Sequence, residues 1–144
     1  MNNTEHLRAW YTEVWEKGNL DKIGEFFAND TIATGIVPEI QVGTGELQEL
    51  VMAFQAHVGK FKIDLAKVIE QGDWVAALVI VRTTRGDTGA PLEVTGQIMT
   101  RFKDGKIVEA YNHFDYVSLL EQMELLPADT IPICLTGQRL TWAS

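Results

Sequence analysis

Apolar residues recur at helical spacing near the start of the chain. The positions that share one helix face are Leu7, Trp10, Tyr11, Val14 and Trp15. A pattern of this kind predicts an amphipathic helix that presents one apolar stripe to a core. Asn3 or Thr4 is available as its N-cap, and Gly18 is expected to end it.

Two more helices and one extended segment are expected before the pattern changes. Residues 20–27 predict a short helix, and residues 31–37 predict an extended segment that ends at Pro38. Thr44 is the expected cap of a third helix, whose apolar positions repeat at helical spacing until Gly59 breaks it.

After Gly59 the spacing becomes that of strands. Phe61, Ile63 and Leu65 alternate with polar residues, whereas residues 74–81 (WVAALVIV) are continuously apolar. A continuous apolar strand implies cover on both faces, so its back is expected to pack against something else, such as a second subunit. Helices followed by strands predict an α+β fold, with helices on one face of a curved antiparallel sheet.

The end of the sheet carries the candidate chemistry. Residues 92–102 predict a strand, and Asp104-Gly105 predicts a tight hairpin because glycine tolerates a positive φ. Side chains of the strand that follows alternate between two faces. One face is expected to hold Ile107, Glu109, Tyr111, His113 and Asp115, and the other Val108, Ala110, Asn112 and Phe114. The first set passes from apolar to polar, which is typical of a pocket wall.

Asp115 has two interpretations, and both stay open. It precedes an expected helix at residue 116 or 117, where an aspartate is a standard N-cap worth about 1 kcal/mol. If instead it reaches a cavity, loss of hydration would raise its pKa and let it exchange a proton with a ligand. His113 would lie beside it and share or orient that proton.

Size and composition narrow the class of protein. The 144 residues suffice for one domain with an internal cavity. There is no apolar run of membrane-spanning length and no leader-like start, and the single Cys134 fits a reducing compartment, so a cytoplasmic protein is expected. The net charge of −8 repels nucleic acid and anionic lipid, so neither is an expected partner.

No metal or cofactor site is expected. His6, His57 and His113 lack the close spacing that metal ligands favour. Residues 42–47 (VGTGEL) resemble a phosphate-binding loop but lack its lysine.

Three stretches together carry a family resemblance. They are WYTEVWEKGNLDKIGEFFANDTIATG, QGDWVAALVIVRTT, and RFKDGKIVEAYNHFD followed by LLEQMELLP. The chain resembles the SnoaL-like branch of the nuclear-transport-factor-2-like superfamily, which includes polyketide cyclases. The resemblance covers residues 7–127 and implies a cone: a bent antiparallel sheet wrapped by N-terminal helices around a deep apolar cavity, commonly dimeric through the outer face of the sheet.

The resemblance also implies site residues. In the polyketide cyclases a strand ends in an aspartate that acts as acid and base, and Asp115 matches it, with His113 matching a histidine two positions before. Tyr111 stands where tryptophan is usual, Arg101 where some members carry a pocket histidine, and Thr34 where a first-strand histidine is common.

Other branches of the superfamily match less well. A steroid-isomerase-like site needs a carboxylate near the position of Gly35, although Tyr11 stands where such enzymes keep a phenol. An epoxide-hydrolase-like site needs an arginine and an aspartate two apart on one strand, whereas Arg82 is followed by Thr83 and Thr84.

Three hypotheses follow for residues 1–127, with residues 128–144 as a tail that is either a flexible terminus or an arm on the sheet or a partner. The first is a cofactor-independent acid/base enzyme of the cyclase or isomerase type acting on a small hydrophobic, carbonyl-bearing molecule. Asp115 and His113 would be catalytic. The residues expected to bind the ligand are Tyr11, Trp15, Met99, Arg101 and Tyr111. The second is a non-catalytic module that binds a hydrophobic ligand, and the third is a dimerisation domain with a filled cavity. A homodimer is expected.

Overall fold

The computed structural model describes residues 2–37 and 40–141. Its helices are α1 (Asn3–Trp10), the π-helix η1 (Tyr11–Glu16), the 3₁₀ turn η2 (Leu20–Lys22), α2 (Ile23–Phe26), α3 (Thr44–Gln55), α4 (Tyr116–Gln122) and α5 (Thr130–Leu135). Its strands are β1 (Ile32–Val37), β2 (Ile40–Gly43), β3 (Lys62–Gln71), β4 (Trp74–Thr84), β5 (Pro91–Lys103) and β6 (Lys106–Phe114). Pro38 and Trp142 lie outside the described residues.

The strands form one sheet in the order β2-β1-β6-β5-β4-β3. The strands from β3 to β6 make the expected antiparallel meander, and β2 pairs antiparallel with β1. The sheet departs from antiparallel pairing where β1 runs parallel to β6, with Ala33 opposite Ala110. Gly35 allows this approach: its φ is +83°, and a Cβ there would lie 1.9 Å from the main-chain oxygen of Asn112.

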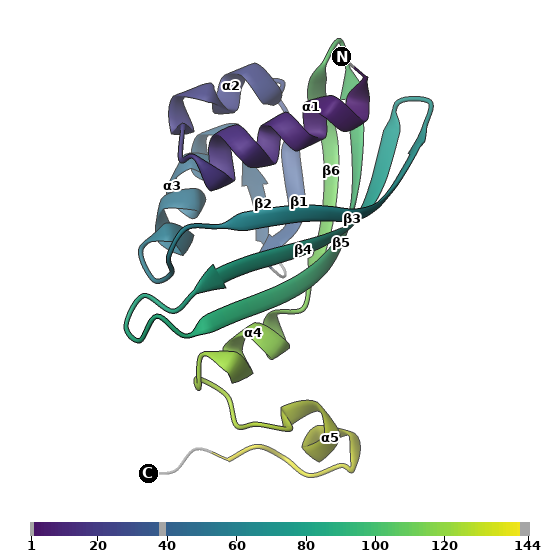
Figure 1. The fold of residues 1–144 in the computed structure, drawn as a ribbon. Coiled ribbons are helices and arrows are strands. Elements are labelled where there is room, and N and C mark those ends of the chain that lie inside the picture. The colour runs from purple at the N-terminus through teal and green to yellow at the C-terminus, as the bar shows by residue number, and fades with distance from the viewer. Residues whose placement is uncertain (1, 38–39, 142–144) are drawn as a thin grey trace.

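The sheet is bent, and α1, α2 and α3 lie on one side of it (Figure 1). The apolar stripe expected on the first helix is confirmed, since Leu7, Trp10 and Val14 are buried against the sheet. Full burial of each such side chain contributes about 1.5–3 kcal/mol. The predicted α+β class, with a curved sheet and N-terminal helices, is therefore confirmed.

The first helix changes its winding at Tyr11. Lys17 N donates to Thr12 O at 2.9 Å, a five-residue spacing that belongs to the wider π-helix. Two contacts fix this segment: Ile63 N donates to Glu16 Oε1 at 2.7 Å, and Gln55 Nε2 donates to Trp15 O at 3.4 Å. Wide turns of this type are frequent at functional sites.

The hairpin between β5 and β6 is confirmed. Lys103 pairs with Lys106, and the two turn residues Asp104 and Gly105 both have positive φ, at 53° and 76°. That combination belongs to the primed turn that the dipeptide predicts.

The outer face of the sheet carries apolar side chains without cover from this chain. Ile69, Met99 and Tyr111 are 71%, 51% and 42% exposed. In β4 the inward Val75, Ala77 and Val79 are buried and the residues between them are half-buried. The second subunit expected over this face stays a prediction.

The chain after α4 leaves the body of the domain. In Figure 1, α4 follows the end of β6 and α5 lies beyond it, away from the sheet. Ile131 and Leu135 on α5 are 49% and 81% exposed. Among the described residues, no helix is long and apolar enough to cross a membrane.

Candidate functional site

An apolar cavity of about 100 Å³ lies between the helices and the concave face of the sheet. Its described lining residues are Trp10, Tyr11, Trp15, Ile36, Phe54, Phe61, Ile63, Val81, Val94, Asn112, Phe114, Tyr116 and Leu119. Most of the wall is aromatic, and adjacent rings contact one another: Trp15 lies 6.0 Å from Phe54 and 5.8 Å from Phe61 between ring centroids. Such a wall suits a flat apolar ligand.

Tyr11 brings a hydroxyl group to this apolar space. The side chain is 9% exposed, and its hydroxyl makes no hydrogen bond to any other residue in the described part of the chain. Burial raises the pKa of the Tyr11 phenol well above its usual value of 10.0, so the group stays a neutral donor. The described residues include no fully buried side-chain nitrogen or oxygen without a partner, so the unpaired Tyr11 oxygen opens onto the cavity, where a ligand oxygen could accept its hydrogen bond.

Asn112 is the second polar group of the wall. Its Nδ2 donates to Thr34 O at 3.1 Å, which joins β6 to β1, and the residue is 8% exposed. Its Oδ1 accepts no hydrogen bond from another described side chain or amide. The cavity thus combines one hydroxyl donor with one amide acceptor.

Tyr116 closes the cavity from α4. Its hydroxyl donates to Ile36 O, and burial raises its pKa to about 12. The ring stacks on Phe54, with centroids 6.3 Å apart, and meets Phe114 edge-on. Phe114 in turn needs Gly96 beneath it, because a Cβ at Gly96 would lie 2.3 Å from the ring.

Of the residues predicted from sequence, Tyr11 and Trp15 line the cavity. Tyr111, His113, Met99 and Arg101 do not: they lie on the opposite, outer face of the sheet, where Tyr111, His113 and Met99 border a shallow depression. The face of β6 that was expected to line the pocket therefore points outward, except at its first residue, Ile107.

A β-bulge explains the reversal. Phe102 pairs with Ile107, but Arg101 pairs with Glu109, so Val108 is an extra residue in β6. One extra residue shifts the alternation by one position. As a result Ala110 and Asn112 turn inward. Two adjacent apolar residues, Ile107 and Val108, are the only hint of the bulge in the sequence.

The outer-face residues form a network of their own. Arg101 Nε and Tyr111 Oη donate to the two carboxylate oxygens of Glu109, at 3.1 and 2.8 Å. The Tyr111 hydrogen bond, followed by Arg101, lowers the pKa of Glu109, and the same bond raises the pKa of Tyr111. Trp74 stacks on Tyr111 at 6.4 Å. These groups are satisfied by one another.

Asp115 is exposed and stands at the start of α4. Ser118 N donates to its Oδ1 at 3.0 Å, so the capping interpretation is confirmed. Asp115 and His113 are not among the described lining residues of the cavity, and their catalytic role stays a prediction. In the described part of the chain no cluster of three or more His, Cys, Asp or Glu side chains could hold a metal ion.

Comparison with known proteins gives this geometry a context. A model of the SnoaL-like polyketide cyclase family matches residues 5–123. The chain belongs to this family. No curated protein sequence matches it.

Solved structures agree at the level of fold. IdmH, a candidate polyketide cyclase from Streptomyces antibioticus, is 23% identical with a TM-score of 0.76, over 86% of this chain and 99% of that one. A candidate polyketide cyclase from Acidithiobacillus ferrooxidans is 17% identical with a TM-score of 0.75, over 85% and 94%. A protein of ketosteroid-isomerase-like fold from Catenulispora acidiphila, solved with trimethylamine, is 21% identical with a TM-score of 0.73, over 87% and 95%.

Proposed function

We propose that this protein is a cofactor-independent enzyme of the polyketide-cyclase type whose cavity binds a small hydrophobic molecule through a carbonyl group. The observation that carries the proposal is the unpartnered Tyr11 hydroxyl in an apolar, aromatic wall. A neutral phenol in such a wall donates to a ligand oxygen without competition from water.

Tyr11 would act on the carbonyl oxygen. Its O–H stabilises the negative charge that gathers there when an α-proton leaves or when a carbon nucleophile adds. Asn112 Oδ1 would accept a hydrogen bond from a hydroxyl, such as the enol form of the ligand. The described wall has no carboxylate or imidazole to take the proton. The chemistry therefore favours β-dicarbonyl substrates, which form an enol without a protein base. The enol carbon adds to a second carbonyl group, and the oxygen of that carbonyl takes up the proton that the enol oxygen releases.

The same lack of a carboxylate in the described wall favours a second function, a non-catalytic module that binds a hydrophobic ketone. In that case the Tyr11 hydroxyl selects the ligand by a hydrogen bond, and the bound ligand does not react.

One pair of variants tests the proposal and separates the two functions. Tyr11→Phe removes the hydroxyl from the cavity, and Tyr111→Phe removes a hydroxyl from the outer face as the matched control. With a linear aryl β-diketone ester as probe, cyclisation in Tyr11→Phe is expected to fall by about 10²–10³-fold, with binding weakened about tenfold at most. If the unmodified protein shows no turnover and Tyr11→Phe loses ligand binding, the protein is the binding module. If Tyr11→Phe changes neither turnover nor ligand binding, both functions are contradicted.

A further inference from the structure

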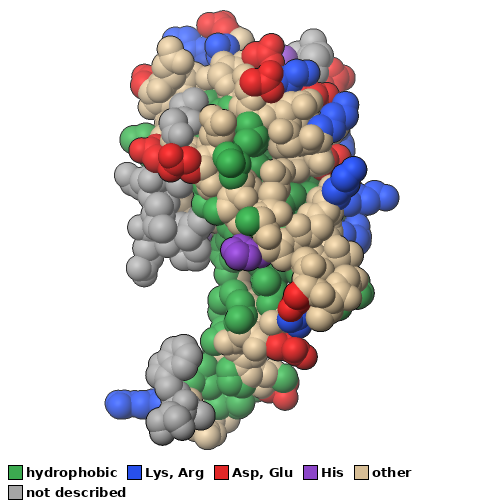
Figure 2. Space-filling model, turned by 90° about the vertical axis from the view of Figure 1, so that its left-hand side faces the viewer, with side chains coloured by type: hydrophobic (Ala, Val, Ile, Leu, Met, Phe, Trp, Pro, Cys, Tyr) green, Lys and Arg blue, Asp and Glu red, His purple; other side chains and the backbone are tan. Residues whose placement is uncertain are grey.

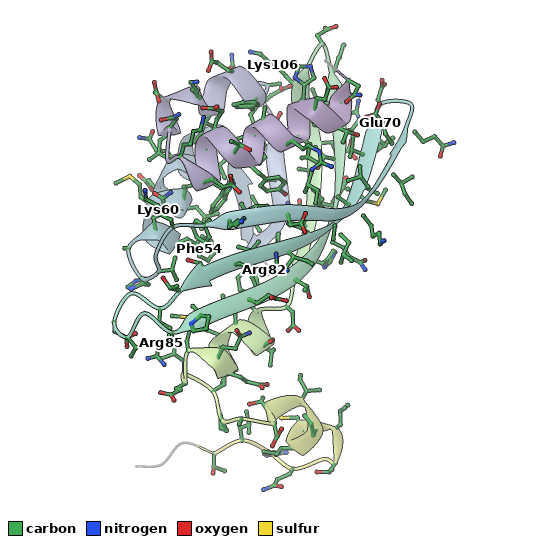
Figure 3. The ribbon with its side chains drawn as sticks, in the orientation of Figure 1. Phe54, Lys60, Glu70, Arg82, Arg85 and Lys106 are labelled. Carbon is green, nitrogen blue, oxygen red and sulfur yellow. The ribbon has the colours of Figure 1, made fainter. Side chains whose placement is uncertain are left out.

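A second, larger hollow adjoins the cavity. It has a volume of about 880 Å³ and lies between α3, the turn after β4, and α4. Figure 2 shows hydrophobic side chains along the neck between the body and the C-terminal segment, and Figure 3 labels Phe54 and Arg85, which both line this hollow. The cavity of about 100 Å³ is smaller than the roughly 150 Å³ that holds benzene, so a ring-bearing ligand needs additional space.

The two spaces share a wall. Phe54, Tyr116 and Leu119 line both of them. Tyr116 is tied to β1 by its hydrogen bond to Ile36 O, whereas Phe54 is held by ring contacts alone. Rotation of the Phe54 or Leu119 side chain therefore breaks no hydrogen bond. Of these two, Phe54 is the larger, and its ring lies between Trp15 and Tyr116, so its rotation opens more of the wall.

We propose that the cavity and the hollow are two parts of one binding site, with the Phe54 ring as the partition that sets ligand size. The ligand is a neutral molecule of several fused or linked rings, with its carbonyl at Tyr11 and its distal rings in the hollow. The identity of the carbonyl end rests on the proposed function; the two-part site rests on the shared wall. The hollow falls within the roughly 300–1,000 Å³ of small-molecule sites.

The charges of the hollow indicate that the distal end of the ligand is uncharged. The one arginine among its described lining residues, Arg85, is 15% exposed and already paired, with Asp87 at 2.8 Å and with Glu124 at 3.3 Å. An anionic ligand would have to displace one of these carboxylates. Leu50, Leu120 and Met123 give the rest of the surface an apolar character that suits rings.

A segment of the chain itself is the competing occupant. Helix α5 carries exposed Ile131 and Leu135 and is joined to the hollow through Leu125. If α5 of a second copy filled the hollow, no ligand could extend there. The structure of a ligand complex distinguishes the two occupants.

The experiment compares Phe54→Ala with Leu50→Ala, a control on the same helix that lines the hollow but not the cavity. Titration calorimetry with a small ketone that has no ring (butanone) and a three-ring ketone (anthrone) measures the size limit. If the Phe54 partition is open in about a tenth of the protein molecules, its removal strengthens the binding of a large ligand about tenfold. That gain is expected for anthrone in Phe54→Ala, with butanone binding little changed and with no gain in Leu50→Ala. Phe54→Leu, which keeps more of the packing, is expected to give an intermediate gain.

Equal anthrone affinity in all variants overturns the two-part site, and so does a crystal structure of the anthrone complex with the hollow empty or filled by α5. Tyr11→Phe gives the independent check on the proposed function: if it leaves butanone binding unchanged while the Phe54 effect holds, the function fails and the two-part site stands. If neither ketone binds, the crystal structure of ligand-free Phe54→Ala tests the two-part site. A cavity that is continuous with the hollow supports the proposal, and side chains that move in to separate the two spaces contradict it.

Discussion

The Tyr116 hydroxyl donates a hydrogen bond to the main-chain oxygen of Ile36, which lies 80 positions earlier in the chain. This bond ties α4 to β1 across the cavity, so the first and last parts of the domain close the site together. Tyr116→Phe keeps the ring stack on Phe54 but leaves the Ile36 carbonyl without this donor. We expect a loss of about 1–3 kcal/mol in the free energy of unfolding, measured by urea denaturation. Tyr111→Phe, whose bond is exposed, is the control and is expected to lose less. Equal losses would contradict a closing role for Tyr116.

Gly35 and Gly72 offer a matched pair for the β1–β6 contact. Both have positive φ, at 83° and 56°, but only a Cβ at Gly35 would meet another atom, Asn112 O. Gly72→Ala is expected to cost about 1–2 kcal/mol from backbone strain alone. Gly35→Ala is expected to cost more than about 3 kcal/mol, because the parallel strands must also separate. Similar costs for the two, measured by thermal and urea unfolding, would show that β1 can move away from β6 freely.

Asp115→Asn is expected to be nearly silent in melting temperature and in ligand affinity, because asparagine caps a helix about as well as aspartate. Asp115→Ala is expected to lose about 1 kcal/mol of stability. Both follow from the bond between Ser118 N and Asp115 Oδ1. A fall in turnover of about a hundredfold in a well-folded Asp115→Asn protein would return this carboxylate to the mechanism.

Most of the fold follows from local pattern, and the site does not. The stripe on α1 and η1, the meander and the Asp104-Gly105 hairpin are all encoded by neighbours in sequence, and all are observed. The inward face of β6 depends on one bulge at Val108, which pairing with β5 creates and which alternation alone cannot reveal. Alternation alone therefore predicts the wrong face for Asn112, and the parallel contact of β1 with β6 joins segments too distant for a local pattern to predict.

Stability is expected to fall in acid through Glu13. Its carboxylate accepts hydrogen bonds from Lys17, Asn19 and Lys22, and these, led by Lys17, lower its pKa from 4.5 to about 2. A carboxylate with a lowered pKa stabilises the fold above its unfolded pKa and loses that contribution as the pH falls toward its folded pKa. The loss attributable to Glu13 should lie between pH 4.5 and about 2. In Glu13→Gln the pH dependence in this window should be shallower, and an unchanged profile would contradict the assignment.

The outer face of the sheet is expected to pair with a second copy. Ile69 and Met99 expose apolar surface there, and covering such surface stabilises by roughly 25 cal/mol per Å². Sedimentation is expected to show a dimer, which Ile69→Lys shifts toward monomer. Ile131→Lys places the same charge on α5 and should leave the dimer intact. If only the α5 variant dissociates it, the tail and not the sheet makes the interface.

The parallel pairing of β1 with β6 also has a consequence for folding during synthesis of the chain. Ala33 and Thr34 find their partners, Ala110 and Tyr111, only after nearly the whole domain has been synthesised. Contacts between segments so far apart form late, because a long loop must close first. During translation the edge of β1 that faces β6 is therefore expected to stay unpaired, available to chaperones, until β6 has left the ribosome. Completion of the sheet at the first strand therefore depends on the last strand that is synthesised.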